Sequence, residues 1–115
     1  MHTKTYKIGK CKGNARIWIE GNELLNAGFL PSTKYTLEYK ETSINPRIIL
    51  RSDFIAEGLK IKKVSSCAGG SRPIIDLNNK KVTKYLDENF DGANSVKVTF
   101  NAEGTKGIIV IQPNI

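Results

Sequence analysis

The chain contains few of the residues that usually carry catalysis. Only one of its 115 residues is histidine, and two are cysteine. The single His2 cannot form a two-histidine acid–base pair. Together with Cys11 and Cys67 it offers at most three soft metal ligands, none at zinc-finger spacing. The sequence also lacks a G-x-x-x-x-G-K-[ST] phosphate-binding loop. We therefore predict no catalytic residue, no metal site and no cofactor, and leave a toxin-type ribonuclease open as the alternative.

Long hydrophobic runs are also missing, which predicts a protein without membrane contact. No stretch approaches the roughly 18 apolar residues that a membrane-spanning helix requires. The lysines near the N-terminus are not followed by the apolar run of a signal peptide. Two cysteines do not make a disulfide framework. The sequence therefore predicts an intracellular, cytoplasmic protein that forms a single domain over residues 1–115.

What the chain does contain is an internal repeat. Cys11–Arg16 and Cys67–Arg72 share the spacing C-x-G-x-x-R, and each is followed by alternating apolar residues. The offset between matching positions begins at 56 residues and settles at 61. We predict two β-α-β-β pseudo-repeats, at about 11–53 and about 67–115. Either half alone is too short to bury its own core, so the halves should share one core about a two-fold axis. The residues expected in that shared core are Ile17, Ile19, Leu37, Ile75, Leu77 and Val98.

Local patterns predict a mainly β fold with two short helices. The helices are expected at 22–27 and 80–89, with Asn22 and either Asn78 or Asn79 as N-caps. A positive φ is expected at Gly28, after the first helix. The expected strands lie at 4–9, 16–20, 34–41, 47–51, 59–64, 95–101 and 108–111, with a glycine-containing turn at 10–15.

The net charge of +7 is concentrated in two segments that contain no acidic residue, 1–19 and 58–75. A two-fold arrangement is expected to bring these segments to one end of the molecule, as binding to a phosphate backbone requires. The alternative is a solvated basic face that only maintains solubility. Trp18 follows Arg16 on the predicted strand, where it is either an exposed contact residue or covered by a neighbouring element. The predicted nucleic-acid-binding residues are Lys10, Lys12, Arg16, Trp18, Lys60, Lys62, Lys63 and Arg72.

Residues 17–39, IWIEGNELLNAGFLPSTKYTLEY, resemble the core pattern of SymE-like toxins, a branch of the AbrB superfamily. The matching residues are Ile17, Ile19, Gly21, Leu24, Ala27, Gly28, Phe29, Thr33, Tyr35, Leu37 and Tyr39. The chain departs from the pattern at Ser32, where the family usually has glycine, and at Glu23, where the toxin has an aromatic residue. The second half has Glu88-Asn89-Phe90 in place of A-G-F.

This resemblance implies an AbrB-like swapped-hairpin β-barrel, here formed by two tandem repeats of one chain. It also implies a small basic nucleic-acid-binding protein, with an AbrB-type DNA-binding transcriptional regulator as the first hypothesis. Double-stranded DNA is the favoured partner and RNA is possible. Two alternatives remain open: a SymE-like toxin that acts on RNA or the nucleoid, and a mobile-element or phage inhibitor that contacts a defence or modification complex. The sequence leaves open whether the protein is a monomer or a homodimer.

Overall fold

The computed structural model describes residues 2–40, 45–52, 58–66, 72–90, 92–103 and 106–114, without the side chains of Cys11, Glu103 and Lys106. The described part is mainly β with two helices, as predicted. The elements are β1 (His2–Lys7), β2 (Gly9–Cys11), β3 (Asn14–Glu20), α1 (Asn22–Asn26), β4 (Lys34–Lys40), β5 (Arg47–Ser52), β6 (Lys60–Lys63), β7 (Ser65–Ser66), β8 (Pro73–Leu77), α2 (Lys80–Asn89), β9 (Ser95–Glu103) and β10 (Lys106–Pro113).

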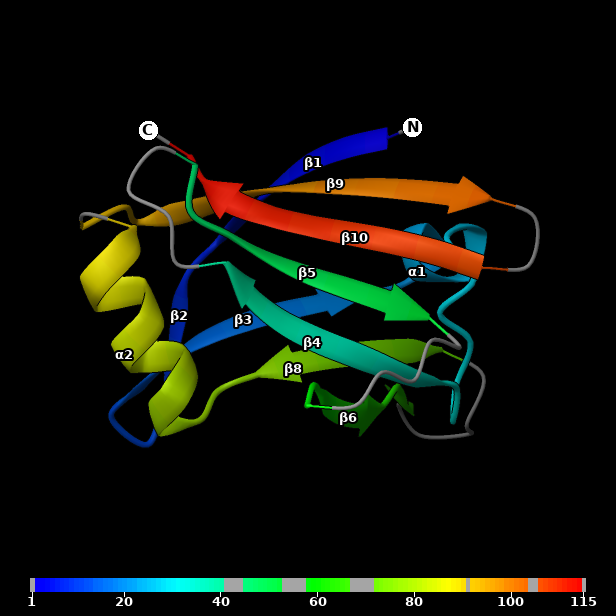
Figure 1. Cartoon of the computed structure of the whole chain (residues 1–115), viewed down its shortest axis with the longest axis horizontal. Coiled ribbons are helices and arrows are strands. Elements are labelled where there is room, and N and C mark those ends of the chain that lie inside the picture. Colours follow the sequence, from blue (N-terminus) through cyan, green and yellow to red (C-terminus); the bar gives the residue numbers. More distant parts are fainter. Residues whose placement is uncertain are drawn as a thin grey trace.

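The described strands form two sheets (Figure 1). The larger sheet has the order β1-β9-β10-β5-β4-β6, and the smaller has the order β2-β3-β8-β7. Both orders are symmetric. The strands β1 to β5 of the first half correspond, in sequence order, to β6 to β10 of the second. Exchanging each strand for its counterpart gives the same order read backwards. The central pairs are β10 with β5 and β3 with β8, so each sheet is centred on a contact between the two halves.

The strand registers follow the same symmetry residue by residue. In the hairpin β4–β5, Tyr35 faces Ser52, and in β9–β10, Val96 faces Pro113, each 61 residues later. At the centre of the larger sheet, Ile49 faces Val110, its own counterpart at that offset. Such pairing is expected when a two-fold axis passes between the two strands.

The symmetry extends beyond the expected repeat boundaries of 11–53 and 67–115. β1 pairs with β9 at one edge of the larger sheet, and β6 pairs with β4 at the other. In the smaller sheet, Gly9 of β2 faces Arg16, and Ser65 of β7 faces Ile74. Each half therefore begins with two short strands that the sequence pattern did not reveal as part of the repeat.

The strands as described do not form a closed barrel. The chain passes from the larger to the smaller sheet at Ile8, between β1 and β2, and again at Val64, between β6 and β7. The two sheets are thus linked at both edges by the chain itself. The expected swapped-hairpin barrel is not confirmed by this arrangement.

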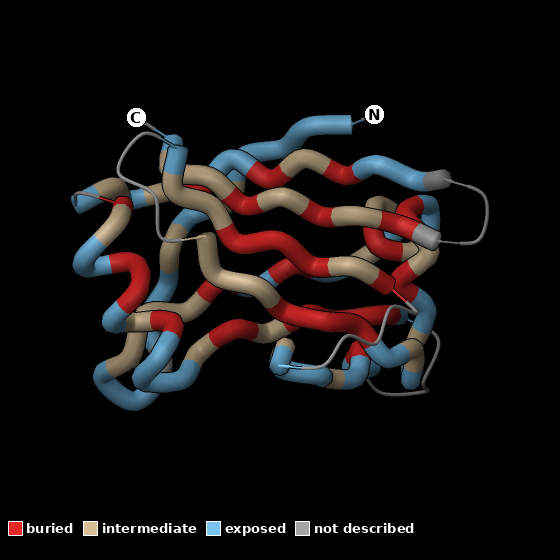
Figure 2. Tube along the Cα trace, in the orientation of Figure 1, coloured by how far each residue is buried: buried red, intermediate tan, exposed pale blue. Residues whose placement is uncertain are grey.

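Alternation along the strands places one apolar cluster between the sheets and the helices, as the buried stretches in Figure 2 show. Ile17 and Ile19 of β3 face Leu77 and Ile75 of β8 on the buried side, while Trp18 faces Asp76 on the opposite side. The six residues expected in a shared core all belong to this cluster. Because both halves contribute to it, neither half has a separate core within the described residues.

The two helices differ in how they begin. Asn79 caps α2, since its side chain accepts a hydrogen bond from the Val82 amide at 2.9 Å. The cap predicted at Asn22 is wrong: the N-cap of α1 is Gly21, with φ 98° and no side-chain hydrogen bond. Asn22 is instead the first residue of the helix.

The end of α1 is as predicted. Gly28 has φ 84°, and the amides of Gly28 and Phe29 donate to the carbonyls of Leu25 and Leu24. This is the Schellman pattern, in which a glycine at C′ closes the last turn. Ser32 also has a positive φ, 70°, a backbone conformation that glycine adopts at no steric cost.

The turn expected over 10–15 is shorter than predicted. Lys12 and Gly13 both have positive φ, and they connect β2 to β3 as a two-residue hairpin loop. The turn between β9 and β10 includes residues 104–105, which lie outside the described part; the two strands pair antiparallel. No helix in the described ranges has the length and apolar character needed to cross a membrane.

Candidate nucleic-acid interface

The edge formed by β6 and β4 carries the densest group of positive charges. Lys60, Lys62 and Lys63 lie on β6, the last strand of the larger sheet, and Lys34 faces Lys63 directly from β4. The paired segments, Lys34–Leu37 and Lys60–Lys63, contain four lysines and no acid. Like charges directly opposite each other in a sheet are destabilising. This strand pair therefore favours the approach of an anion.

Lys62 differs from its neighbours because its side chain is partly buried. It faces the buried Tyr35 across the strand pair. Burial lowers the pKa of the Lys62 ammonium, and Asp76 partly opposes this effect. A phosphate beside Lys62 would raise that pKa again, because an opposite charge favours the ammonium form.

Arg16 and Trp18 form a second cluster, on the outer side of β3. The Arg16 guanidinium binds Asp76 in a bidentate way, with Nε at 2.9 Å from Oδ1 and Nη2 at 2.8 Å from Oδ2. The same guanidinium lies 4.3 Å from the centre of the Trp18 ring. Asn78 also donates to Asp76, at 3.0 Å. Arg16 is therefore held by groups of its own chain.

Trp18 is 37% exposed, so a neighbouring element does not cover it, which was one of the two cases that the sequence left open. It lies where the two halves meet, opposite Asp76. Because Arg16 fixes one part of the ring, Trp18 offers an ordered aromatic surface rather than a mobile one. Such a surface can contact a base or an apolar group of a protein.

The basic segments do not meet at one end, contrary to the prediction. Lys12 precedes β3 beside α2, where the Ala15 amide donates to Thr83 at 2.9 Å. Arg72 precedes β8 beside the start of α1, where the Gly21 amide donates to the Pro73 carbonyl. These two positions are separated by the length of β3, about 20 Å at 3.3 Å per residue. The reason is that β3 and β8 are antiparallel, so the turns before them lie at opposite ends of the smaller sheet.

The expected equivalence of Arg16 and Arg72 is also wrong. In the first half, Gly9 of β2 pairs with Arg16 of β3. In the second half, Ser65 of β7, the counterpart of Gly9, pairs with Ile74 of β8. Ile74, not Arg72, is therefore the counterpart of Arg16. The offset has therefore already changed from 56 residues in β2 to 58 in β3, a shift that the C-x-G-x-x-R spacing concealed.

The remaining predicted contact residue, Lys10, is exposed on β2 opposite Ala15. It lies on the opposite edge of the smaller sheet from β7, and so away from the β6 lysines. The sequence did not single out Lys34 or Asp76 as site residues. Lys34 could have been found only from its pairing with Lys63, which is not local in sequence.

No group of three or more potential metal ligands occurs in the described ranges. Cys67 and the side chain of Cys11 lie outside the described part.

Comparison with known proteins identifies no relative. No family model matches the chain, and no match is found among the curated proteins or among the solved structures.

Proposed function

We propose that the protein binds nucleic acid through the β4–β6 edge, with double-stranded DNA as the favoured partner. The observation that carries the proposal is the direct opposition of Lys34 and Lys63 on one face of the strand pair. Lys60 and Lys62 add two positive charges on the other face of the same edge, because side chains alternate along a strand. Side chains two residues apart on a strand are about 7 Å apart, comparable to the spacing of adjacent phosphates on one DNA strand. These lysines would position the nucleic acid through its backbone, without reading sequence.

The simpler explanation of a lysine-rich edge strand is protection against pairing with another chain. Both explanations account for Lys60 and Lys63 on an outer strand. They differ in what replacement of a lysine should do. An edge that only blocks pairing should self-associate when a charge is removed, whereas a phosphate-binding edge should lose affinity for nucleic acid.

The test measures binding of duplex DNA, single-stranded DNA and RNA by fluorescence anisotropy at several salt concentrations. Lys63→Gln should weaken all sequences alike and reduce the slope of log K against log salt by about one unit. Lys84→Gln is the matched control, because Lys84 is exposed on α2, 4.0 Å from Glu88. Equal slopes for the two variants would contradict the proposal, and self-association of Lys63→Gln would favour edge protection.

A protein-binding role is the second candidate, and the exposed Trp18 with its bound Arg16 favours it. This role corresponds to the inhibitor or adaptor hypothesis. It predicts no binding of any nucleic acid even at low salt, and a stable complex with a protein partner that Trp18→Ala weakens. Selective binding of RNA in the same experiment would instead favour the toxin hypothesis.

We also propose that the chain arose by tandem duplication and belongs with the AbrB-like swapped-hairpin proteins. The matching registers and symmetric strand orders of the two halves support the duplication. The segment 17–39 is the support for the family. An isolated first half that assembles as a homodimer would strengthen the duplication proposal, and one that stays unfolded at all concentrations would weaken it.

A further inference from the structure

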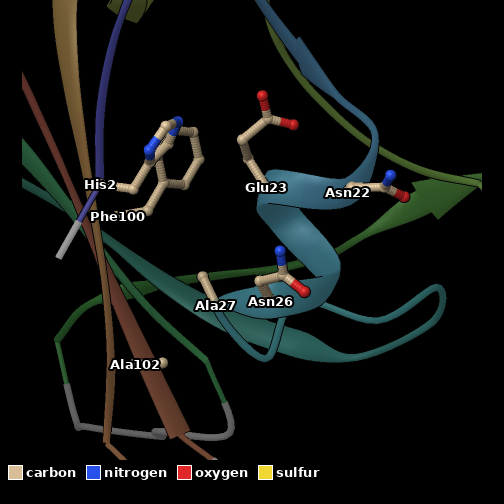
Figure 3. Close-up of a pocket in the computed structure, with 7 residues that line it drawn as sticks. All are labelled: His2, Asn22, Glu23, Asn26, Ala27, Phe100 and Ala102. Carbon is tan, nitrogen blue, oxygen red and sulfur yellow. The ribbon is translucent and has the colours of Figure 1, made fainter.

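A hollow in the described part lies between α1 and the strands β1 and β9. It has a volume of about 500 Å³ and is lined by His2, Asn22, Glu23, Asn26, Ala27, Phe100 and Ala102. Figure 3 shows the rings of His2 and Phe100 side by side, facing Glu23 and Asn26 of the helix. The volume is within the range of small-ligand sites, about 300–1,000 Å³.

The second half of the molecule has a corresponding space between its helix α2 and the strand β4. The strand registers make Tyr39 of β4 the counterpart of Phe100. In that half, the ring of Tyr85 from α2 lies 5.0 Å from the ring of Tyr39, and the remaining hollow is smaller, about 290 Å³. In the first half, α1 contributes no aromatic ring to the hollow; the buried Phe100 has its ring 6.1 Å from that of the exposed His2. In one half an aromatic ring of the helix thus packs on the strand, and in the other half the hollow beside the strand is larger.

Polar groups at the rim of the hollow restrict the chemistry of a ligand. A backbone hydrogen bond and the Lys4 ammonium, 3.1 Å away, hold the pKa of Glu23 below its usual range. The carboxylate is therefore ionised and can only accept hydrogen bonds. Asn26 adds an exposed carboxamide, for which no hydrogen-bond partner occurs within the described ranges.

We propose that this hollow binds an unpaired guanine base, packed between the His2–Phe100 rings and α1 and recognised by Glu23. Guanine presents two adjacent N–H donors, N1–H and the N2 amino group, to the two oxygens of a carboxylate. The neighbouring O6 is an acceptor and suits the Lys4 ammonium. Adenine and cytosine offer an amino group beside an acceptor, and uracil offers a single N–H between two acceptors. The inference rests on the proposed nucleic-acid-binding function and adds a base preference to it.

The experiment titrates the full chain with GMP, AMP, CMP and UMP and follows backbone and Asn side-chain amides by NMR. All four ligands carry the same phosphate, so its contribution cancels in the comparison. We expect shifts centred on residues 22–27 and at least about tenfold tighter binding of GMP than of UMP. Glu23→Gln and His2→Ala should each weaken GMP binding by about tenfold, as loss of a bidentate or a stacking contact does. Lys84→Gln, at the smaller hollow, should leave it unchanged.

The outcomes separate this inference from the function on which it rests. Equal binding of the four nucleotides, with shifts confined to β4 and β6, would overturn the guanine site and leave the proposed function standing. Guanine-selective shifts at 22–27 in a protein that binds no oligonucleotide would support the site and contradict the proposed function. Binding of N-acetylargininamide, with no nucleotide bound, would overturn the inference in favour of an arginine from a protein partner. Variants are compared only if their amide spectra retain the dispersion of the parent.

Discussion

The two halves of the molecule share their strand registers but differ in their helices. α1 has five residues and is followed by the C-cap Ala27 and by Gly28, while α2 has ten residues and a side-chain cap at Asn79. Pairing of backbone groups fixes the strands, and a one-residue shift would turn the buried side chains outward. The helices are held mainly by side-chain contacts, which do not set their length in the way that backbone pairing sets a strand register. The hollow beside the shorter helix and Phe100 is larger than the one beside the longer helix and Tyr39.

Close packing of α1 is the feature whose disruption should have the largest effect. A Cβ added at Gly107 of β10 would lie 1.5 Å from the Ala27 carbonyl oxygen, at the end of α1. The Gly107 amide also donates to Ser52 at 2.8 Å. Gly107→Ala should therefore cost about 3 kcal/mol or more of the free energy of unfolding, measured with urea.

Gly92→Ala is the matched control for this substitution. Gly92 has φ 73° and open space around its Cβ position, so only the backbone cost of about 1–2 kcal/mol applies. Equal losses in the two variants would show that α1 does not lie as close to β10 as the structure places it.

The tyrosines of the second half provide a comparison of intermediate size. The Tyr85 hydroxyl lies within hydrogen-bond distance of the Lys40 and Arg47 carbonyls, the latter at 2.9 Å. The Tyr39 hydroxyl is buried, with no hydrogen-bond partner within the described ranges. Tyr85→Phe should thus cost about 1–3 kcal/mol, whereas Tyr39→Phe should be neutral or slightly stabilising at neutral pH.

The contribution of Tyr39 to stability can also be measured through its dependence on pH. Burial raises the pKa of Tyr39 to about 12. The folded state therefore holds this proton more tightly than the unfolded state, and the associated stability is lost as the pH rises from about 10 to about 12. Tyr39→Phe should reduce this alkaline loss. A larger loss in Tyr39→Phe than in the parent would contradict the assignment.

The smallest expected effect concerns the cluster where the two halves meet on the smaller sheet. A double-mutant cycle of Arg16→Ala and Asp76→Ala should give a coupling energy of about 1 kcal/mol, at the upper end for partly exposed ion pairs because the contact is bidentate. Arg16→Lys should recover only part of it, since an ammonium cannot make both contacts. The pair Lys84–Glu88, 4.0 Å apart and mostly exposed, should show almost no coupling. Equal coupling of the two pairs would contradict the role assigned to Arg16.

Structural features that depend on residues close together in sequence could be predicted from the sequence. Alternation of apolar residues predicted the long strands, and the capping asparagine predicted the start of α2. The prediction failed at Asn22, because Gly21 adopts a positive φ and occupies the cap position itself. The edge strand β7 was missed since two serines carry no apolar alternation.

The candidate site was less predictable than the fold. The sequence identified Lys60, Lys62 and Lys63 and the exposed Trp18 beside Arg16. It could not show that Asp76 binds Arg16, 60 residues away, or that Lys34 faces Lys63. It also grouped Lys12 with Arg72, although the antiparallel pairing of β3 and β8 separates them.

The sequence by itself determined the mainly β character, the positions of the helices and the doubled pattern, because these depend on side-chain periodicity and on turn residues close along the chain. The tertiary structure decided which strands lie at the edges, which charges are neutralised by a partner, and where a hollow remains. Those outcomes depend on contacts between residues far apart in sequence. A two-fold relationship between the halves then places equivalent residues on opposite sides of the molecule, which no local pattern can reveal.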